Sequence, residues 1–236
     1  MSHTTPPTPL NIPINEYLNH TKYITEELIS LLNKVEDDWA NTYHKSGVIP
    51  MYEKNTQVYT NFAEFLEEKG QTEESLDYLS RADQHSQTEE TYKQQVQANQ
   101  DYYNNALLIK NSPLQSIAQA LLQIGKQGIS SRYGKSKGDC SQALIDAGVT
   151  MPTISSKSVS LLDVIWEGRN QSIHFEDKSF HTPTDNCFKT LIKDPAKLYQ
   201  DLKGYDNGEN KAMEIIRILG WTKYSKYESD LLSLSV

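Results

Sequence analysis

Apolar side chains recur along most of this 236-residue chain every three or four positions, the spacing that places them on one face of a helix. The pattern is firmest after Ser112-Pro113, a pair typical of a helix start. Ser158 or Ser160 could cap the start of the apolar run that follows them, and Gly220 is expected to stop a helix. Pro50 is expected to end the first long helix, because proline interrupts a helix interior. Strand-like alternation is missing, so the sequence predicts an all-α fold, a helical bundle with an additional N-terminal helical region. Helices are expected at residues 14–45, 55–69, 72–82, 87–110, from 113 onward, 158–177, 185–193, 195–203, 208–219 and 222–234.

The distribution of charge divides the chain into two parts. The net charge is −8; residues 1–111 hold eight basic and seventeen acidic residues, whereas residues 112–236 hold fifteen and fourteen. We therefore expect an acidic N-terminal helical region at 14–111, preceded by a disordered Thr- and Pro-rich arm at 1–13, and a helical domain at 112–236. Such a balance argues against a general nucleic-acid binder, although the acidic half could bind a basic partner.

A small basic cluster in the second half is still compatible with RNA binding. Its members could hold a phosphate backbone, and an ordinary solvated loop is an equal alternative. They are Lys126, Arg132, Lys135 and Lys137.

The stretch RNQSIH at residues 169–174 holds the clearest candidate chemistry. An Arg offers a permanent charge and a donor fork suited to phosphate, and a His moves protons near neutral pH. Metal-free cleavage of a phosphodiester uses both abilities. On a helical wheel Arg169 falls in the middle of the apolar face, and Asn170 and His174 fall on a polar stripe beside it with Asp163 and Glu167. Because a buried unpaired charge is costly, a structural Arg paired with a carboxylate of another helix is one interpretation.

The angle between the two side chains poses a problem for a shared site. Arg169 and His174 lie about 140° apart on an ideal helix, so an undistorted helix cannot direct both at one point. Gly168 could loosen the helix here, or a second copy of the chain could complete the site.

The sequence around this motif, LLDVIWEGRNQSIHFED at 161–177, resembles the signature helix of HEPN domains. In that family an Arg is followed after four to six residues by a His, and often directly by a polar residue. Two further stretches, LLQIGKQGISSRYG (121–134) and AMEIIRILGWTKYSKYESDLLSL (212–234), resemble bacterial members of the group, so the resemblance covers residues 112–236. It implies a helical bundle that commonly dimerises. By this resemblance Arg169 and His174 form a catalytic pair, and Asn170 supports them.

Many HEPN proteins are metal-independent endoribonucleases in toxin, phage-defence or RNA-processing systems, whereas others only bind nucleotides or partner proteins. The resemblance therefore implies RNA as the substrate, no cofactor, and a homodimer with its active site on the two-fold axis. Trp166 and Ile173, beside the polar stripe, are expected at the dimer seam. An antitoxin or other regulatory protein is a further candidate partner. The alternative is a non-catalytic HEPN module that binds a nucleotide or a protein.

Other chemistry finds little support in the sequence. The group His174, Glu176, Asp177 and His181 matches no strong metal-ligand spacing, so no metal site is expected. The two cysteines, Cys140 and Cys187, are far apart and are expected as thiols in a reducing cytoplasm. No apolar run is long enough to span a membrane, and the N-terminus lacks the pattern of a signal peptide. We therefore expect a cytoplasmic protein with no membrane partner.

Overall fold

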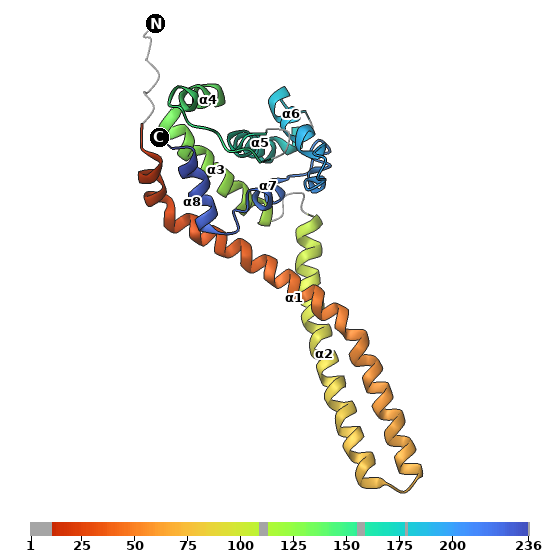
Figure 1. The fold of residues 1–236 in the computed structure, drawn as a ribbon. Coiled ribbons are helices and arrows are strands. Elements are labelled where there is room, and N and C mark those ends of the chain that lie inside the picture. The colour runs from red at the N-terminus through yellow and green to blue at the C-terminus, as the bar shows by residue number, and fades with distance from the viewer. Residues whose placement is uncertain (1–10, 109–112, 155–158, 178, 236) are drawn as a thin grey trace. The chain divides into compact units, whose positions relative to one another are not determined.

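The computed structural model describes residues 11–108, 113–154, 159–177 and 179–235, and the side chains of all of these except Trp39 and residues 100–108. Within these ranges the chain forms eight α-helices, two short 3-10 helices and no strand, which confirms the predicted all-α class (Figure 1). The elements are α1 (Ile14–Glu68), α2 (Thr72–Leu108), α3 (Pro113–Tyr133), α4 (Lys137–Asp146), α5 (Leu161–His174), η1 (Phe175–Asp177), α6 (Thr182–Ile192), η2 (Gln200–Leu202), α7 (Ala212–Leu219) and α8 (Tyr224–Ser233).

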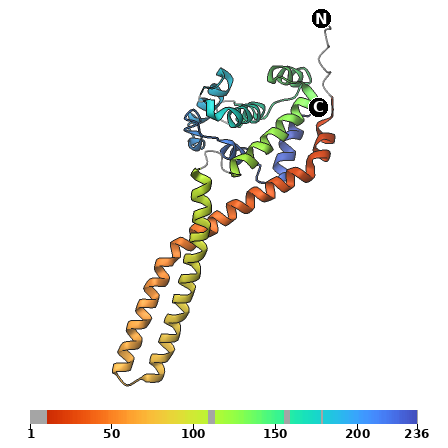
Figure 2. The same cartoon turned by 180° about the vertical axis from the view of Figure 1, so that it is seen from behind.

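The chain separates into two compact units, and α1 contributes to both. The core unit comprises the described residues of 1–33 and 109–236, and the hairpin unit comprises residues 34–108. This division differs from the boundary expected at residue 111, because the first part of α1 packs with the second half of the chain. Two long-range hydrogen bonds show the packing: the Tyr17 hydroxyl donates to the Ile124 carbonyl at 2.9 Å, and the Asn33 amide donates to the Thr222 carbonyl at 3.0 Å. Both views show this part of α1 alongside α3 and α8 (Figures 1 and 2).

The core unit is organised around α3, α5 and α7. α5 packs against α3, α6 and α7, and α3 also contacts α4, α7 and α8. Helix ends follow the sequence signals: α3 begins at Pro113, and α7 ends at Gly220, whose φ of 70° is the left-handed conformation that glycine adopts readily. Fully buried side chains from these helices and the connection between α7 and α8 form the core, among them Leu121, Leu122, Leu161, Ile165, Ile216, Trp221, Tyr227 and Leu231.

The hairpin unit is built from the rest of α1 and from α2, which run antiparallel and join at residues 69–71 (Figure 1). The expected break at Pro50 is wrong, because α1 continues through this residue to Glu68. Contacts with α2 lie on both sides of the proline: Thr42 accepts a hydrogen bond from Asn99 at 2.7 Å, and Tyr52 packs edge-on against Tyr92 with ring centroids 5.5 Å apart. These contacts offset the hydrogen bond that proline removes. The two helices expected at 72–82 and 87–110 are likewise one helix, α2.

One expected helix is largely replaced by turns. Only residues 200–202 of the predicted 195–203 helix are helical, as the short η2. The Asp194 side chain accepts a hydrogen bond from the backbone N–H of Ala196 at 2.9 Å, and Lys197 has a left-handed φ of 55°. Local side-chain capping of this kind competes with helix formation. The expected disordered arm at 1–13 lies mostly outside the described residues.

Among the described helices, none is both long enough and apolar enough to cross a lipid bilayer.

Candidate functional site

Helix α5 positions the Arg–His motif, and both of its flanks are well anchored. Ser160 caps its start by accepting a hydrogen bond from the backbone N–H of Asp163 at 3.0 Å, as one of the two predicted caps. Near its centre, Gly168 lies so close to α7 that an added Cβ would sit 2.8 Å from Cγ2 of Ile215. The helix runs without interruption from Leu161 to His174. Gly168 therefore serves close packing of two helices, and the predicted loosening of α5 at this residue is not observed.

Arg169 is half-buried on the side of α5 that meets α3. Its Nε donates to Oε1 of Gln123 at 2.6 Å, and its Nη1 donates to Oδ1 of Asn170 at 3.3 Å. Burial lowers the pKa of the guanidinium from its ordinary value. In the described part of the chain both acceptors are neutral amide oxygens, not the carboxylate expected for a structural Arg. These two bonds orient the guanidinium without neutralising it, and some of its five N–H donors stay available.

Lys126 brings a second cation to the same place. Its ammonium lies 4.5 Å from the centre of the Trp166 ring, a distance suited to a cation–π contact. Burial lowers the pKa of Lys126, and the positive charge of Arg169 lowers it further. Two like charges share a partly buried region, and neither forms an ion pair with a carboxylate among the described residues. An anion placed between them would relieve this repulsion, so the pair is a candidate phosphate site.

A buried polar network supports Asn170 from behind. The carboxylate of Glu167, 3% exposed, accepts hydrogen bonds from Thr184 of α6 at 2.7 Å and from Asn170 at 3.2 Å. Lys137, at the start of α4, forms ion pairs with Glu167 at 2.5 Å and Asp163 at 2.9 Å. Burial opposes the charge on Lys137, but the hydrogen bonds to both carboxylates outweigh it and raise its pKa. The network thus ties α4, α5 and α6 together under the motif.

His174 lies at the other end of the motif, in different surroundings. It is the last residue of α5 and its side chain is 55% exposed. Its Nδ1 lies 3.1 Å from Oδ2 of Asp177 in η1. When Nδ1 donates this hydrogen bond, the other ring nitrogen, Nε2, is left to accept a proton. His174 and Arg169 share no hydrogen-bond partner among the described residues, as the 140° angle expected from an ideal helix implies.

The basic residues predicted to bind RNA divide into separate environments. Lys126 joins Arg169, while Lys137 is held by Glu167 and Asp163, so a phosphate contact by Lys137 would require breaking two ion pairs. Arg132, in the last turn of α3, donates to Oδ1 of Asn11 at 2.5 Å. Lys135 is exposed between α3 and α4.

Three residues that contact the predicted site residues were not themselves predicted: Gln123, Glu167 and Asp177. Gln123 has no charge and no motif to mark it. Glu167 was placed on the polar stripe, but the sequence does not show that α4 and α6 cover that stripe. Asp177 was considered only as a metal ligand, although its spacing of three residues from His174 is a usable signal, because such residues are neighbours on a helical turn.

The sequence also offered metal-ligating groups and thiols as candidates. Among the residues that the structure describes, no group of three or more His, Cys, Asp or Glu side chains is arranged to hold a metal ion. Cys140 and Cys187 are free and buried, and burial raises the pKa of their thiols to about 11 and about 12.

Comparison of the chain with family models, curated proteins and solved structures finds no match.

Proposed function

We propose that this protein is a metal-independent endoribonuclease of the HEPN type, which cleaves RNA through Arg169 and His174. The observation that carries the proposal is the paired charge of Arg169 and Lys126, which amide and aromatic partners hold and with which no carboxylate of the described residues forms an ion pair. Such a pair favours an anion with several oxygens, and a phosphodiester is one. An exposed His lies about one turn further along the same helix, with a carboxylate on its Nδ1.

The proposed reaction uses the nucleophile that RNA itself carries. The 2′-oxygen attacks the adjacent phosphorus and the bond from phosphorus to the 5′-oxygen breaks, which leaves a 2′,3′-cyclic phosphate and a 5′-hydroxyl. An unprotonated His174 takes the proton of the 2′-hydroxyl through Nε2 and acts as the general base. A protonated His174 gives a proton to the departing 5′-oxygen and acts as the general acid. Arg169 and Lys126 stabilise the negative charge that builds on the phosphoryl oxygens. Asn170 holds the guanidinium and is held in turn by Glu167.

The proposed active form is a homodimer. Because Arg169 and His174 face different surroundings in one copy, a site that uses both is completed by the α5 helix of a second copy, in an isologous contact. Ile173 is 37% exposed and is available for such a seam. Trp166, expected there as well, is only 7% exposed and lies under Lys126. It therefore supports the site from within one chain.

The proposal places the protein in the cytoplasm, where its RNA substrates and a reducing environment for its two thiols are found. A ribonuclease of this kind fits a toxin or antiviral defence system, with an antitoxin or other regulatory protein that restrains it.

A cleavage assay tests the proposal. Purified protein is incubated with single-stranded RNA in EDTA, and wild type is expected to produce fragments that end in a cyclic phosphate. Arg169→Ala and His174→Ala should each lower the rate by about 100-fold or more, since each removes a group that acts on the reacting atoms. His20→Ala changes an exposed histidine of α1 in the same unit and should cut at the wild-type rate. Wild-type cleavage by both motif variants, with helical content unchanged, would refute the assigned site.

The orientation of the motif in one copy also favours a second function, a module that binds RNA or a nucleotide without cleaving it. Arg169 and Lys126 could hold a phosphate while His174 stays away from it. In that case Lys126→Met and Arg169→Ala would weaken binding of a fluorescent RNA oligonucleotide. Neither wild type nor His174→Ala would cleave the RNA.

A further inference from the structure

The hairpin unit carries apolar side chains that neither of its helices buries. On α1, Val58, Phe62 and Phe65 are 52%, 42% and 49% exposed, and their spacing places them on one face of the helix. Phe62 and Phe65 belong to an aromatic cluster: the centre of the Phe62 ring lies 6.1 Å from that of Phe65, and Phe62 packs edge-on against Tyr78 of α2 at 4.7 Å. Exposed large apolar groups that adjoin one another mark interaction sites more often than single exposed residues do.

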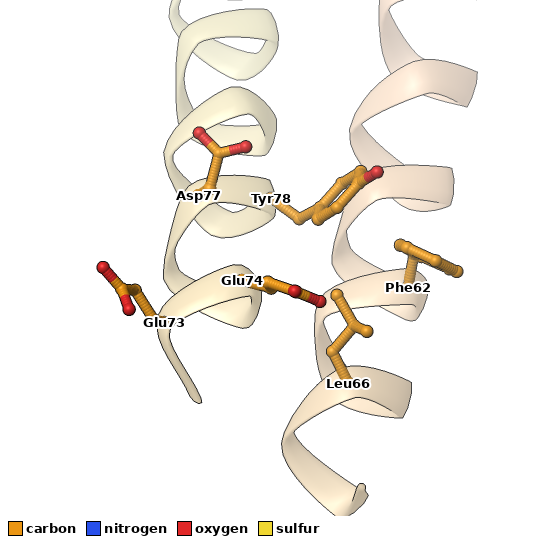
Figure 3. A pocket seen from close by; sticks show the side chains of 6 residues that line it. All are labelled: Phe62, Leu66, Glu73, Glu74, Asp77 and Tyr78. Atoms are coloured by element: carbon orange, nitrogen blue, oxygen red, sulfur yellow. The ribbon is translucent and has the colours of Figure 1, made fainter. Parts of the chain in front are cut away.

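Val58 and Phe62 border a groove between α1 and α2. One hollow, of about 520 Å³, is lined by Phe62, Leu66 and Tyr78 together with the acidic residues Glu73, Glu74 and Asp77. In Figure 3, Glu74 and Tyr78 extend from α2 toward α1, Asp77 lies over α2, and Glu73 extends to the side of α2 that faces away from α1. A second hollow of about 430 Å³ continues along Val58 and Tyr59 and shares Phe62 and Tyr78 with the first. The two together are called the hairpin groove here, defined by Val58, Phe62, Leu66, Glu73, Glu74, Asp77 and Tyr78.

The rim of the hairpin groove is negatively charged. Among the described residues, neither Glu73 nor Glu74 forms an ion pair, and Asp77 pairs only with Arg81 at 2.8 Å. Both members of that pair are more than half exposed, so their attraction is weak. Two cations lie nearby: the Lys69 ammonium is 5.5 Å from the centre of the Phe65 ring, and the Arg81 guanidinium is 5.3 Å from the centre of the Tyr78 ring. They offset only part of the charge of Glu73, Glu74 and Asp77. The groove therefore combines an apolar floor with an acidic edge.

We propose that the hairpin groove binds an amphipathic helix of a partner protein, with apolar residues on one face and Lys or Arg beside them. The apolar face of such a helix would cover Val58, Phe62 and Tyr78, in the manner of a helix laid in a hydrophobic groove. Its basic residues would meet Glu73 and Glu74. A second copy of this chain fits less well, because its own groove has the same acidic rim and like charges would face each other. An anionic lipid surface is disfavoured for the same reason.

A designed peptide tests the proposal on the full chain. The probe is an 18-residue peptide of Leu and Lys, with Leu at the positions of one helical face, labelled and titrated at physiological salt. Phe62→Ala and Glu74→Lys are each expected to weaken its binding by about tenfold, as expected for a central contact and for a reversed charge. Two matched changes on α2 lie outside the hairpin groove: Leu79→Ala, at a residue 41% exposed, and Glu90→Lys. Each should change the affinity by less than about twofold.

Several outcomes would overturn the proposal. One is no binding of the Leu/Lys peptide, and another is equal binding to wild type, Phe62→Ala and Glu74→Lys with helical content preserved. A third is equally tight binding of a Leu/Glu peptide, since charge complementarity would then play no part. A fourth is self-association that Phe62→Ala abolishes, which would make a second copy the occupant. None of these results bears on RNA cleavage, because the groove lies in a different unit from Arg169 and His174.

Discussion

Replacing Glu167 by Gln tests whether the polar network under the motif is part of the structural core. The substitution keeps the size of the side chain and removes its charge. In wild type one carboxylate oxygen faces Lys137 at 2.5 Å, and the other accepts from Thr184 at 2.7 Å and from Asn170 at 3.2 Å. A Gln has only one oxygen, so in either orientation its NH₂ group faces at least one donor.

The expected cost follows from these contacts. A buried donor left without an acceptor costs about 1–3 kcal/mol, and a hydrogen bond to a charged group contributes about 1.5–3 kcal/mol. Lys137 is 26% exposed and keeps its ion pair with Asp163, so water and the second carboxylate reduce the loss. We therefore expect Glu167→Gln to lower the free energy of unfolding by about 2–3 kcal/mol. Since Glu167 also holds Asn170, the same variant should cleave RNA more slowly if the proposed site is correct.

Urea unfolding followed by circular dichroism measures this cost. The unfolding midpoint should fall while the slope of free energy against urea is unchanged. Glu26→Gln is the matched control, because Glu26 is 45% exposed and lies 3.9 Å from Lys22 within one turn of α1; it should cost less than about 0.5 kcal/mol. If Glu167→Gln costs no more than this control, the network contributes nothing to stability and the reasoning is wrong. In a Lys137→Met background the cost of Glu167→Gln should shrink, since the lost ion pair is already missing.

Three further predictions follow from the core unit. Gly168→Ala should destabilise the protein, because the added Cβ would clash with Ile215. The clash costs about 1–3 kcal/mol, and the better helix propensity of Ala offsets about 1 kcal/mol of it. Thermal unfolding should show that this cost vanishes in an Ile215→Ala background. Burial alone would raise the pKa of Asp163, but hydrogen bonds from Ser160 and Lys137 outweigh it and lower the pKa. The stability that Asp163 provides is therefore present above its unfolded pKa of about 3.9 and is lost as pH falls through its lower folded value; the difference in unfolding free energy between wild type and Asp163→Asn should be constant near neutral pH and shrink in acid. Light scattering should find a dimer at micromolar concentration, and RNA cleavage per chain should fall on dilution; a monomer with full activity would rule out a shared site.

Local signals in the sequence predicted several elements well. Ser160 before an apolar run, Pro113 after Ser112 and Gly220 after a helix each mark a helix end, and the structure has a helix end at all three. Such signals act within one turn, so a short window of sequence contains them. The continuation of α1 through Pro50 depends instead on α2, about fifty residues away in the chain, and no local pattern around Pro50 includes that contact.

The candidate site shows the same limit at the level of single side chains. The helical wheel placed Arg169 on the buried face of its helix, and Arg169 is half-buried. The wheel does not show what another helix contributes, and the charge of Arg suggested a carboxylate where the structure has the amide of Gln123. The wheel also places Glu167 on a polar stripe and does not show whether other helices cover it. Glu167 is instead covered by Thr184 of α6 and by Lys137 of α4, because a carboxylate can be buried where an ion pair and hydrogen bonds satisfy it.

The angle between Arg169 and His174 decides what kind of site the motif can form. The sequence left two ways for one phosphate to meet both side chains, a distortion of the helix at Gly168 or a second copy of the chain. In the described residues α5 is continuous, and the space beside Gly168 is filled by Ile215. A bend at this point would separate α5 from α7 in the centre of the core. We therefore infer that a catalytic role for the pair requires a second copy, whereas a role in binding phosphate requires only Arg169 and Lys126. Activity that depends on chain concentration would separate these two roles more directly than loss of activity in any single variant.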